Sequence, residues 1–581
     1  MARLACIDPE KIIPISHSTT EVFKTGTWAT ARPEYREKVS ACRAACPAGN
    51  NITGALHKVS QGDFDAALRL FLEETALPGV CGRVCYHPCQ IDCNRGQWDQ
   101  TVQIRAVERA ASELGRAQPQ ILTDDGNGHP VAVIGSGPAG LAAAYHLARM
   151  GHPVDLWEAE DEPGGLLRWG IPQYRLPQEV LEDDLARIFS LGIRMRTGTL
   201  VDGEKLAKIR RKNEAVFIAT GAQKILGVDI PGFKLPGVDL GVGFLRDVRR
   251  GTLKDLRGRV VVIGGGNVAI DAALTAGKLG ADQVDLVCLE ERLEMPAHER
   301  ECEDALEEGV VFHNGWGPKC ILEEGGCLAG VQFVKCTSVF NKEGDFDPNF
   351  DETETLIRDA DRVIVAIGQA PDHSFFRESG LMEGGPGNAL PVDAGTMETS
   401  GPGVFAGGDF VKTPGSVVEA IGAGKRAALA IHLQTVGKSF GEAEAKVRLG
   451  EGPSFSIHAL FHDREDWDPG KVVRFEDLEP LFLDHRPPTA LPRLELELRR
   501  KGFEEIDLPL SAEEAILASE RCFFCGTCTG CDRCFIYCPD MSIIPPGGDF
   551  RTYRSDSDYC KGCAVCEAVC PRGVMSMGEG K

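Results

Sequence analysis

The chain has 581 residues, more than one hydrophobic core can organise, so we expect three to five domains. Its 43% hydrophobic and 26% charged residues are typical of globular proteins, and no run of about 18 apolar residues predicts a membrane span. The formal net charge is −23, and no block of Lys and Arg interleaved with aromatic residues occurs, which excludes nucleic-acid binding. Because the N-terminus shows no secretory signal, we expect a cytoplasmic protein.

Cysteine is the most informative residue type in this chain. Sixteen of the 22 cysteines fall in two groups, within residues 42–93 and 522–570. In a large chain without a secretory signal, clustered C-x2-C and C-x3-C spacings favour metal or iron–sulfur ligation over disulfide bonds. Six cysteines have no ligand spacing, and we interpret them as structural residues: Cys6, Cys288, Cys302, Cys320, Cys327 and Cys336.

The C-terminal cysteine group contains the pattern C-x2-C-x2-C-x3-C-P twice, at residues 528–539 and 560–571. This is the spacing of two-cluster bacterial ferredoxins, in which the fourth cysteine of each run binds the cluster of the other run. A pair of zinc ribbons also uses C-x2-C spacing but does not explain two complete runs. Cys522 and Cys525 precede the first run at the same spacing, and we interpret them as unligated thiols. The predicted [4Fe–4S] ligand sets are Cys528, Cys531, Cys534 and Cys570 for one cluster, and Cys560, Cys563, Cys566 and Cys538 for the other.

The first of two glycine-rich turns follows an apolar strand at residues 131–134. The turn contains Gly135-x-Gly137-x-x-Gly140 and opens a helix, and a second strand then ends at Glu158. Glycines at this spacing allow a tight turn and bring backbone close to a pyrophosphate, while the acid binds ribose hydroxyls. The combination predicts a dinucleotide-binding fold.

A second turn of the same kind lies within residues 260–290. Gly264, Gly266 and Ala269 occupy the three glycine positions, Asn267 opens the helix, and the second strand leads to Glu290. Alanine is an accepted substitute at the third position. Two such folds in one chain predict two bound dinucleotides.

Further motifs accompany the first turn: Gly164-Gly165-Leu166, and GVFAGGD ending at Asp409 with a helix after it. With these, residues 130–435 resemble the flavoprotein disulfide reductase superfamily, in which an NAD(P) domain is inserted into an FAD domain. The resemblance implies that the first turn, Glu158, Gly165 and Leu166 bind FAD, and that Asp409 binds its ribityl or pyrophosphate. It also implies that the helix beginning at Val417 points its positive N-terminus at the flavin. The family's redox-active C-x4-C is missing here.

The N-terminal cysteine group, ACRAACP and GVCGRVCYHPCQIDC, resembles the small subunit of glutamate synthase and relatives such as dihydropyrimidine dehydrogenase. The resemblance implies cluster ligands Cys46, Cys85, Cys89 and Glu108. A second cluster of the family uses Cys42, Cys93 and two upstream cysteines, where this chain has Glu34 and Glu37. Either that cluster is absent, or Cys42 or Cys93 replaces Glu108 in a single cluster. Cys81 is expected to be a packing residue, and a zinc-stapled helical domain is the alternative to iron.

The predicted fold class is α/β, with two nested Rossmann-like domains, a helical Fe–S domain before them and a bacterial ferredoxin-like α+β domain after them. The connector before the last domain is rich in Pro and Glu and ends in an amphipathic helix over residues 512–520. The predicted boundaries are 1–125 for the helical Fe–S domain, 126–225 plus 365–435 for FAD, 226–364 for NAD, 436–515 for the connector and 516–581 for the ferredoxin domain.

The end of the second fold's second strand bears on the choice of nucleotide. NADPH-using relatives carry Tyr-Arg-Arg at this place, whereas this chain has Cys288-Leu289-Glu290. A carboxylate accepts from a ribose 2′-hydroxyl and repels a 2′-phosphate. We predict NAD(H) over NADP(H), although Arg292 is close by.

The expected function is electron transfer between NADH, FAD and at least three [4Fe–4S] clusters, to or from a partner enzyme in a hetero-oligomeric complex. The architecture resembles flavoproteins that serve dissimilatory sulfite reductase and 2-oxoacid oxidoreductases. A free-standing NAD(P)H:ferredoxin oxidoreductase is the alternative. A glutamate synthase small subunit is less favoured, because those subunits lack a C-terminal ferredoxin domain. Hydride transfer needs no catalytic side chain, and none is nominated.

Overall fold

The structure is a computed structural model that describes residues 22–381, 390–412, 415–462, 466–547 and 552–579. The chain divides into two compact units, which we describe separately. The large unit contains Ala41–Asp463 and His485–Cys522, and the small unit contains the remainder. No helix among the described residues has both the length and the hydropathy that crossing a bilayer requires.

The first dinucleotide-binding fold is built on a five-stranded parallel sheet in the order β17-β6-β3-β4-β5. Strand β3 (Val131–Ile134) is buried along its whole length, as expected for a parallel strand covered on both faces. Helices α8 (Pro138–Arg149) and α16 (Val417–Thr435) pack closely against each other. The other elements are β4 (Val154–Trp157), α9 (Leu166–Trp169), α10 (Gln178–Phe189), β5 (Arg194–Arg196), α11 (Gly203–Arg210), β6 (Ala215–Ile218), α15 (Ser374–Glu378), β17 (Val404–Ala406) and η3 (Gly408–Phe410).

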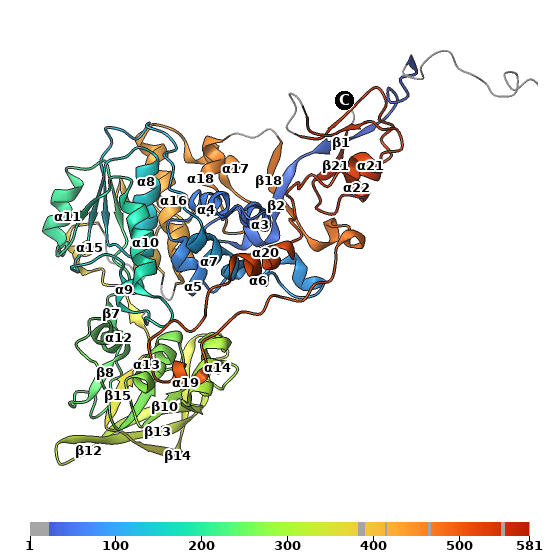
Figure 1. The fold of residues 1–581 in the computed structure, drawn as a ribbon. Helices are drawn as coiled ribbons and strands as arrows, with labels where there is room; N and C mark the ends of the chain where they lie inside the picture. Colours follow the sequence, from blue (N-terminus) through green and yellow to red (C-terminus); the bar gives the residue numbers. More distant parts are fainter. Residues whose placement is uncertain (1–21, 382–389, 413–414, 463–465, 548–551, 580–581) are drawn as a thin grey trace, which may run out of the picture. The chain divides into compact units, whose positions relative to one another are not determined.

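The second fold is inserted into the first, as the sequence predicts. Its parallel sheet has the order β11-β10-β9-β15-β8. A two-stranded ribbon of β7 and β16 marks both chain crossings, and β7 is labelled between the two folds in Figure 1. An antiparallel sheet of β12, β13 and β14 extends it. The elements are β7 (Lys224–Ile225), β8 (Val238–Leu240), α12 (Gly241–Arg249), β9 (Arg259–Ile263), α13 (Asn267–Lys278), β10 (Gln283–Cys288), α14 (Glu299–Glu308), β11 (Val311–Asn314), β12 (Trp316–Glu324), β13 (Cys327–Phe340), β14 (Phe346–Asp359), β15 (Arg362–Val365) and β16 (Gln369–Ala370).

Short helices that carry the N-terminal cysteines form the third part of the large unit. Helices α3 and α4 begin at side-chain caps from Asn51 and Asp63, and α5 begins with proline. Helix α7 packs on α5 and α4. The elements are α2 (Ala41–Ala45), α3 (Ile52–Ser60), α4 (Phe64–Leu72), α5 (Pro78–Val84), α6 (Pro88–Ile91), η2 (Asn94–Gln97) and α7 (Ile104–Leu114), and α17 (Phe440–Val447) and α18 (Ile457–Phe461) follow α16.

Residues 485–522, which we call the strap, belong to the large unit although the sequence predicts a connector over most of them. Arg499 pairs with Glu307 of the NAD-binding fold (2.9 Å), and the backbone N–H of Ile506 donates to the carbonyl oxygen of Tyr174 in the first fold (3.0 Å). The strap contains α19 (Leu496–Arg499) and α20 (Ala512–Glu520), so the helix predicted over residues 512–520 is confirmed. Helix α20 packs on α3 and α7. The strap therefore ties the NAD-binding fold to the cysteine-bearing helices.

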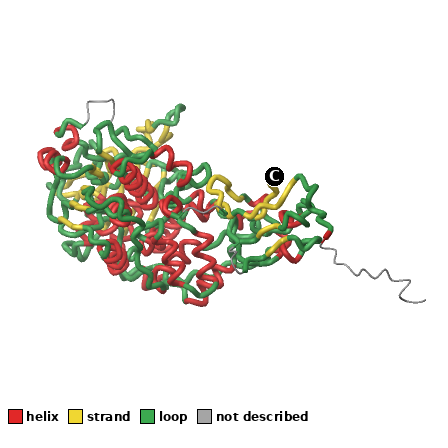
Figure 2. Tube along the Cα trace, turned by 90° about the horizontal axis from the view of Figure 1, so that it is seen from above, coloured by secondary structure: helices red, strands yellow, loops and turns green. Residues whose placement is uncertain are grey.

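The small unit combines three stretches of chain, whereas the sequence predicts a ferredoxin domain from residue 516 alone. Strand β1 (Ala31–Tyr35) pairs with β21 (Met575–Glu579), and β2 (Glu37–Ser40) pairs with β18 (Trp467–Val473). The N-terminal segment thus completes two sheets of this unit, which local sequence patterns do not reveal. The other elements are η4 (Phe475–Asp477), η5 (Pro480–Phe482), α21 (Arg533–Ile536), β19 (Ile543–Ile544), β20 (Arg554–Ser555) and α22 (Val565–Ala568). Figure 2 shows that much of the chain near the label C is loop, drawn in green.

One buried cluster of the small unit consists of Cys534, Ile543, Tyr553, Cys566 and Met575. Two cysteines of the predicted ligand sets, Cys534 and Cys566, therefore occupy core positions that aliphatic residues fill in a larger domain. A small domain with so few apolar contacts needs a further stabilising element, and bound metal can supply it.

Removing the iron should therefore unfold the small unit before the large one. After anaerobic chelation of the full chain, hydrogen exchange in β21 peptides should rise to the level of unfolded chain, while β3 and β9 peptides stay protected by their aliphatic cores. Measurement is by mass spectrometry before and after chelation. Unchanged protection of β21 in iron-free protein would contradict this interpretation of the core.

Candidate functional site

The first glycine turn has one glycine that faces open space between two that are packed. Gly135 has φ +99°, and a Cβ there would collide with the carbonyl oxygen of Ala219. A Cβ on Gly140 would collide with the carbonyl oxygen of Gly135. A Cβ on Gly137 would have no described atom within 4 Å. The turn is therefore shaped so that a phosphate can approach the backbone at Gly137.

Three further predicted residues meet at this turn. The Glu158 carboxylate accepts hydrogen bonds from the backbone N–H groups of Ser136 and Glu160, both at 2.9 Å. A Cβ on Gly165 would lie 2.9 Å from Cα of Gly137. Leu166, the next residue, opens α9. The structure thus brings Glu158, Gly165 and Leu166 to the edge where the first dinucleotide is expected.

Asp409 and the start of α16 lie close to each other in space, although both are far from the first turn in sequence. A Cβ on Gly415 would be 2.6 Å from the Asp409 carboxylate, and burial raises the pKa of Asp409 to about 6. Helix α16 starts at Val417 with a capping box between Ser416 and Glu419. The helix therefore presents a fixed positive end beside Asp409.

The second turn repeats the geometry of the first. A Cβ on Gly264 would collide with the carbonyl oxygen of Ala366, whereas Gly266 faces open space. Asn267 opens α13, and its Oδ1 accepts from the backbone N–H of His298 (2.9 Å). The fully buried Ala269 at the third position packs inside the fold.

Glu290 is positioned over this second turn. Its Oε2 is 2.6 Å from the point where a Cβ on Gly265 would lie. Arg292 instead lies over the ring of Phe312, with 5.8 Å from Cζ to the ring centroid. The carboxylate, rather than the guanidinium, therefore lies against the turn, where the sequence predicts the ribose.

The sulfur of Cys46 is buried in a loop of backbone donors. The N–H groups of Ala48, Gly49 and Asn50 hydrogen-bond to it, and although burial raises its pKa, these bonds act to lower it. The N–H of His87 donates to Cys85 Sγ at 3.3 Å. Such N–H donors to sulfur are typical of iron–sulfur sites.

Glu108 lies in the same buried group, together with Cys46, Cys85 and Cys89. Burial raises the pKa of Cys85 to about 12 and that of Glu108 to about 8, and it raises the pKa of Cys89 well above its usual range. The charge on Cys46 adds to the rise at Cys85 and Cys89. Ionising these buried ligands is costly without a cation, and bound iron would offset that cost. These four residues fit a [4Fe–4S] cluster.

The remaining N-terminal cysteines lie around this group. Cys42 is on α2 and contributes to the raised pKa of Cys89. Cys93 directly precedes η2. Its charge acts against the lowering of the Arg521 pKa that burial causes in the strap. Cys81, predicted as a packing residue, is buried in the core, and burial, with the charges of Glu108 and Cys85, raises its pKa.

Glu34 and Glu37 occupy strands of the small unit. The Glu37 carboxylate accepts from the N–H of Cys528 at 3.1 Å. The chain around these residues therefore contributes to the small unit rather than to the N-terminal cysteine group.

The small unit contains two cavities, each surrounded by four predicted ligands. The residue directly after the second cysteine of each run has a left-handed backbone conformation. These residues are Asp532, with φ 56°, and Ala564, with φ 61°. Such φ values are strained for these residue types, and the matching positions indicate two related loops. The first cavity is lined by Cys528, Cys531, Cys534 and Cys570, and the second by Cys538, Cys560, Cys563 and Cys566.

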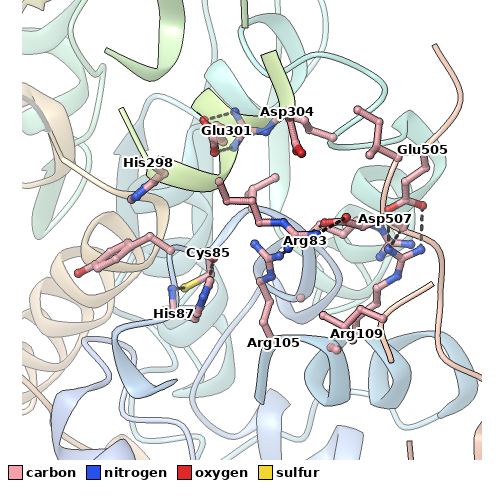
Figure 3. Close-up of a pocket in the computed structure, with 18 of the residues that line it drawn as sticks. Arg83, Cys85, His87, Arg105, Arg109, His298, Glu301, Asp304, Glu505 and Asp507 are labelled. Atoms are coloured by element: carbon pink, nitrogen blue, oxygen red, sulfur yellow. Dashed lines mark hydrogen bonds and ion pairs between the residues drawn. The ribbon is translucent and has the colours of Figure 1, made fainter. Parts of the chain in front are cut away.

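A cavity of about 400 Å³ in the large unit is lined by the predicted ligand Cys85 and by residues of the strap (Figure 3). Glu505 accepts from Arg83 (2.8 Å) and Arg109 (2.9 Å). Asp507 lies 3.5 Å from Arg105. The strap thus neutralises the arginines beside Cys85, a role that its irregular sequence did not indicate.

Three parts of the chain match known families. Residues 129–424 match the pyridine nucleotide-disulphide oxidoreductase family. Residues 31–119 match the dihydropyrimidine dehydrogenase domain II family with a 4Fe-4S cluster, and residues 527–574 match the 4Fe-4S dicluster domain.

Relatives cover most of the chain. It is 38% identical to the beta subunit of NADP(+)-dependent formate dehydrogenase of Moorella thermoacetica, over 68% of this chain and 60% of that protein. It is 34% identical to the beta subunit of NADPH-Fe(3+) oxidoreductase of Geobacter sulfurreducens, over 83% of this chain and 75% of that protein. It is 32% identical to the NAD-dependent dihydropyrimidine dehydrogenase subunit PreT of Escherichia coli, over 67% of this chain and 90% of that protein. The matches confirm the predicted FAD, pyridine nucleotide and [4Fe–4S] cofactors.

Gly137→Val and Gly266→Val form a matched pair of variants. In each, the first added carbon has no described protein atom within 4 Å, so the protein itself tolerates it. We expect Gly137→Val to weaken FAD binding at least tenfold, or about 1.4 kcal/mol, by blocking the pyrophosphate. Gly266→Val should keep FAD but slow its reduction by NADH. Extracted flavin per chain and circular dichroism measure both. Full FAD occupancy in a folded Gly137→Val protein would contradict the assignment of the first turn.

Proposed function

Because the chain belongs to the pyridine nucleotide-disulphide oxidoreductase family, we propose that it is the electron-transferring subunit of a hetero-oligomeric redox complex that uses NADH. The family and the two iron–sulfur matches make it an NAD(P)H-dependent iron–sulfur flavoprotein oxidoreductase. A bound flavin supplies the exchange between hydride pairs and single electrons. The chain's own residues supply the binding sites for these cofactors.

One contact carries the proposal that the flavin exchanges electrons with a cluster on Cys46, Cys85, Cys89 and Glu108. A Cβ on Gly422 of α16 would lie 2.7 Å from the carbonyl oxygen of Pro47, so the helix backbone touches the loop that follows Cys46. Gly422 is five residues, or about 8 Å along the axis, from the helix start at Val417. Tyr86, next to Cys85, hydrogen-bonds to Ser416. Helix α16 thus approaches both the flavin side and the cysteine loops.

We propose that the two cavities of the small unit hold the other clusters, one in each crossed set of four cysteines. Backbone and side-chain donors around Cys538 support this, because the N–H of Ser542 donates to Cys538 Sγ at 3.3 Å. Burial raises the pKa of Cys538, but hydrogen bonds from Ser542 and from the backbone of Asp540 and Ile543 together leave the pKa lowered. A thiolate favoured in this way is a suitable iron ligand.

The proposed partner is a redox protein. The relatives from Moorella, Geobacter and Escherichia are all named as subunits. The architecture fits a partner such as a sulfite reductase or a 2-oxoacid oxidoreductase. Electrons would reach it through the C-terminal clusters.

The proposed preference for NADH rests on two observations. Glu290 lies over the second turn, and the Arg292 guanidinium lies over the ring of Phe312 instead. Wild-type protein should be reduced faster by NADH than by NADPH at equal concentration. Glu290→Arg should narrow or reverse the ratio, because it removes a repulsive charge and adds a phosphate partner. Stopped-flow flavin bleaching measures the ratio. Faster reduction of the wild type by NADPH would overturn the preference.

The proposed outlet can be tested with Cys563→Ser, since Cys563 is exposed and lines the second cavity. Electron transfer to the protein that co-purifies from the native host should fall at least tenfold, while NADH-driven dye reduction stays intact. Cys327→Ser is the matched control, an exposed cysteine outside every ligand pattern. Unchanged transfer in Cys563→Ser would contradict the outlet. A native protein with no stoichiometric partner would favour the free-standing reductase instead.

A further inference from the structure

A buried positive charge lies beside the loop that carries Cys46. Lys425 of α16 is fully buried, and its Nζ donates to Glu74 Oε2 (2.5 Å) and to the carbonyl oxygens of Ala48 (2.6 Å) and Phe455 (2.8 Å). Three acceptors require three N–H donors, which an ammonium group has and a neutral amine lacks. Lys425 is therefore a fixed positive charge whose hydrogen bonds reach the residue two positions after Cys46.

A second cation belongs to the same buried group. The Arg43 guanidinium lies 3.6 Å from Glu74 Oε1, and Ser456 Oγ donates to the same carboxylate. Burial lowers the pKa of Arg43 and of Lys425, and the negative charges of Glu74 and Cys46 act against that fall in both. We call Arg43, Glu74 and Lys425 the buried triad. Its net charge is +1, and both of its cations lie within electrostatic range of the Cys46 sulfur.

The neighbouring carboxylate does not cancel this charge fully. Burial, with the charge of Glu74, raises the pKa of Glu73 to about 7. Near neutral pH this group is therefore only partly ionised. The Cys46 loop thus faces a net positive environment in a poorly solvated interior.

We propose that the buried triad sets the reduction potential of the cluster bound through Cys46. The inference rests on the proposed function, because it requires that cluster. Reduction adds one electron, supplied from NAD(P)H by way of the flavin, and so adds one negative charge to the cluster. A fixed net positive charge in a low-dielectric interior stabilises the reduced form and raises the potential.

The position of the triad suits electron transfer out of the flavin. Lys425 lies eight residues after Val417, or about 12 Å along the axis of α16. A cluster whose potential is raised at this place accepts electrons from the flavin end of the same helix. The triad residues act through the cluster and are positioning residues rather than catalytic ones.

The test is an EPR-monitored redox titration of the full-length protein with all cofactors bound. The signal of the N-terminal cluster is the one that Cys46→Ser removes. Glu74→Gln removes the negative charge but keeps an oxygen acceptor for Lys425, and it should raise the potential. Adding Lys425→Met to Glu74→Gln should lower the potential relative to Glu74→Gln alone. We expect each shift to be at least tenfold in the equilibrium between the oxidised and reduced cluster, or about 59 mV for one electron.

Glu308→Gln is the matched control. Glu308 pairs with Lys278 at the same 2.5 Å between Nζ and Oε2, also in a buried setting, but on helices of the NAD-binding fold. The control should lose stability and leave the potential unchanged. Arg43→Gln, which should lower the potential, provides a test that leaves the Lys425–Glu74 pair intact.

The outcomes separate the two proposals. If Cys46→Ser removes one signal and the triad variants shift it no more than Glu308→Gln does, the role of the triad is overturned. If Cys46→Ser keeps every cluster signal and all of its iron, the proposed ligand set is overturned, and the triad proposal falls with it.

Discussion

Helix α16 contacts two other parts of the large unit with its backbone rather than with side chains. A Cβ on Gly422 would press on the carbonyl oxygen of Pro47, and one on Gly424 would collide with the carbonyl oxygen of Ala139 on α8. Close approach of this kind permits no larger residue. The first dinucleotide-binding fold and the Cys46 loop are therefore fixed against a single helix. The arrangement of the flavin and cluster sites depends on this packing.

Charge is organised around the same contact. The buried triad holds α16 to the segment after α4, and the strap brings Glu505 to Arg83 and Arg109. Removing one partner of such a buried pair leaves an uncompensated charge, which is strongly destabilising. These pairs thus maintain one arrangement of the cysteine-bearing helices, the FAD-binding fold and the NAD-binding fold within the large unit.

The nested folds and both cysteine groups could be predicted, because glycine turns and ligand spacings are local patterns that chemistry constrains tightly. The strap and the β1 and β2 strands of the small unit could not, since their partners lie hundreds of residues away. For Cys81, spacing alone does not show which way the helical side chain points, so its role as a packing residue stays a prediction. The buried ion pair between Lys425 and Glu74 could not be predicted either, because no local pattern links two residues so far apart in sequence.

In the proposed electron path, electrons from NADH leave the flavin through the cluster on Cys46. Rapid-freeze EPR after mixing the protein with NADH follows this step, with dithionite as the reductant that bypasses the flavin. In Cys46→Ser, we expect NADH to reduce the C-terminal clusters at least tenfold more slowly and dithionite to reduce them at an unchanged rate. Reduction of the C-terminal clusters by NADH at the wild-type rate in this variant would rule out the path through Cys46.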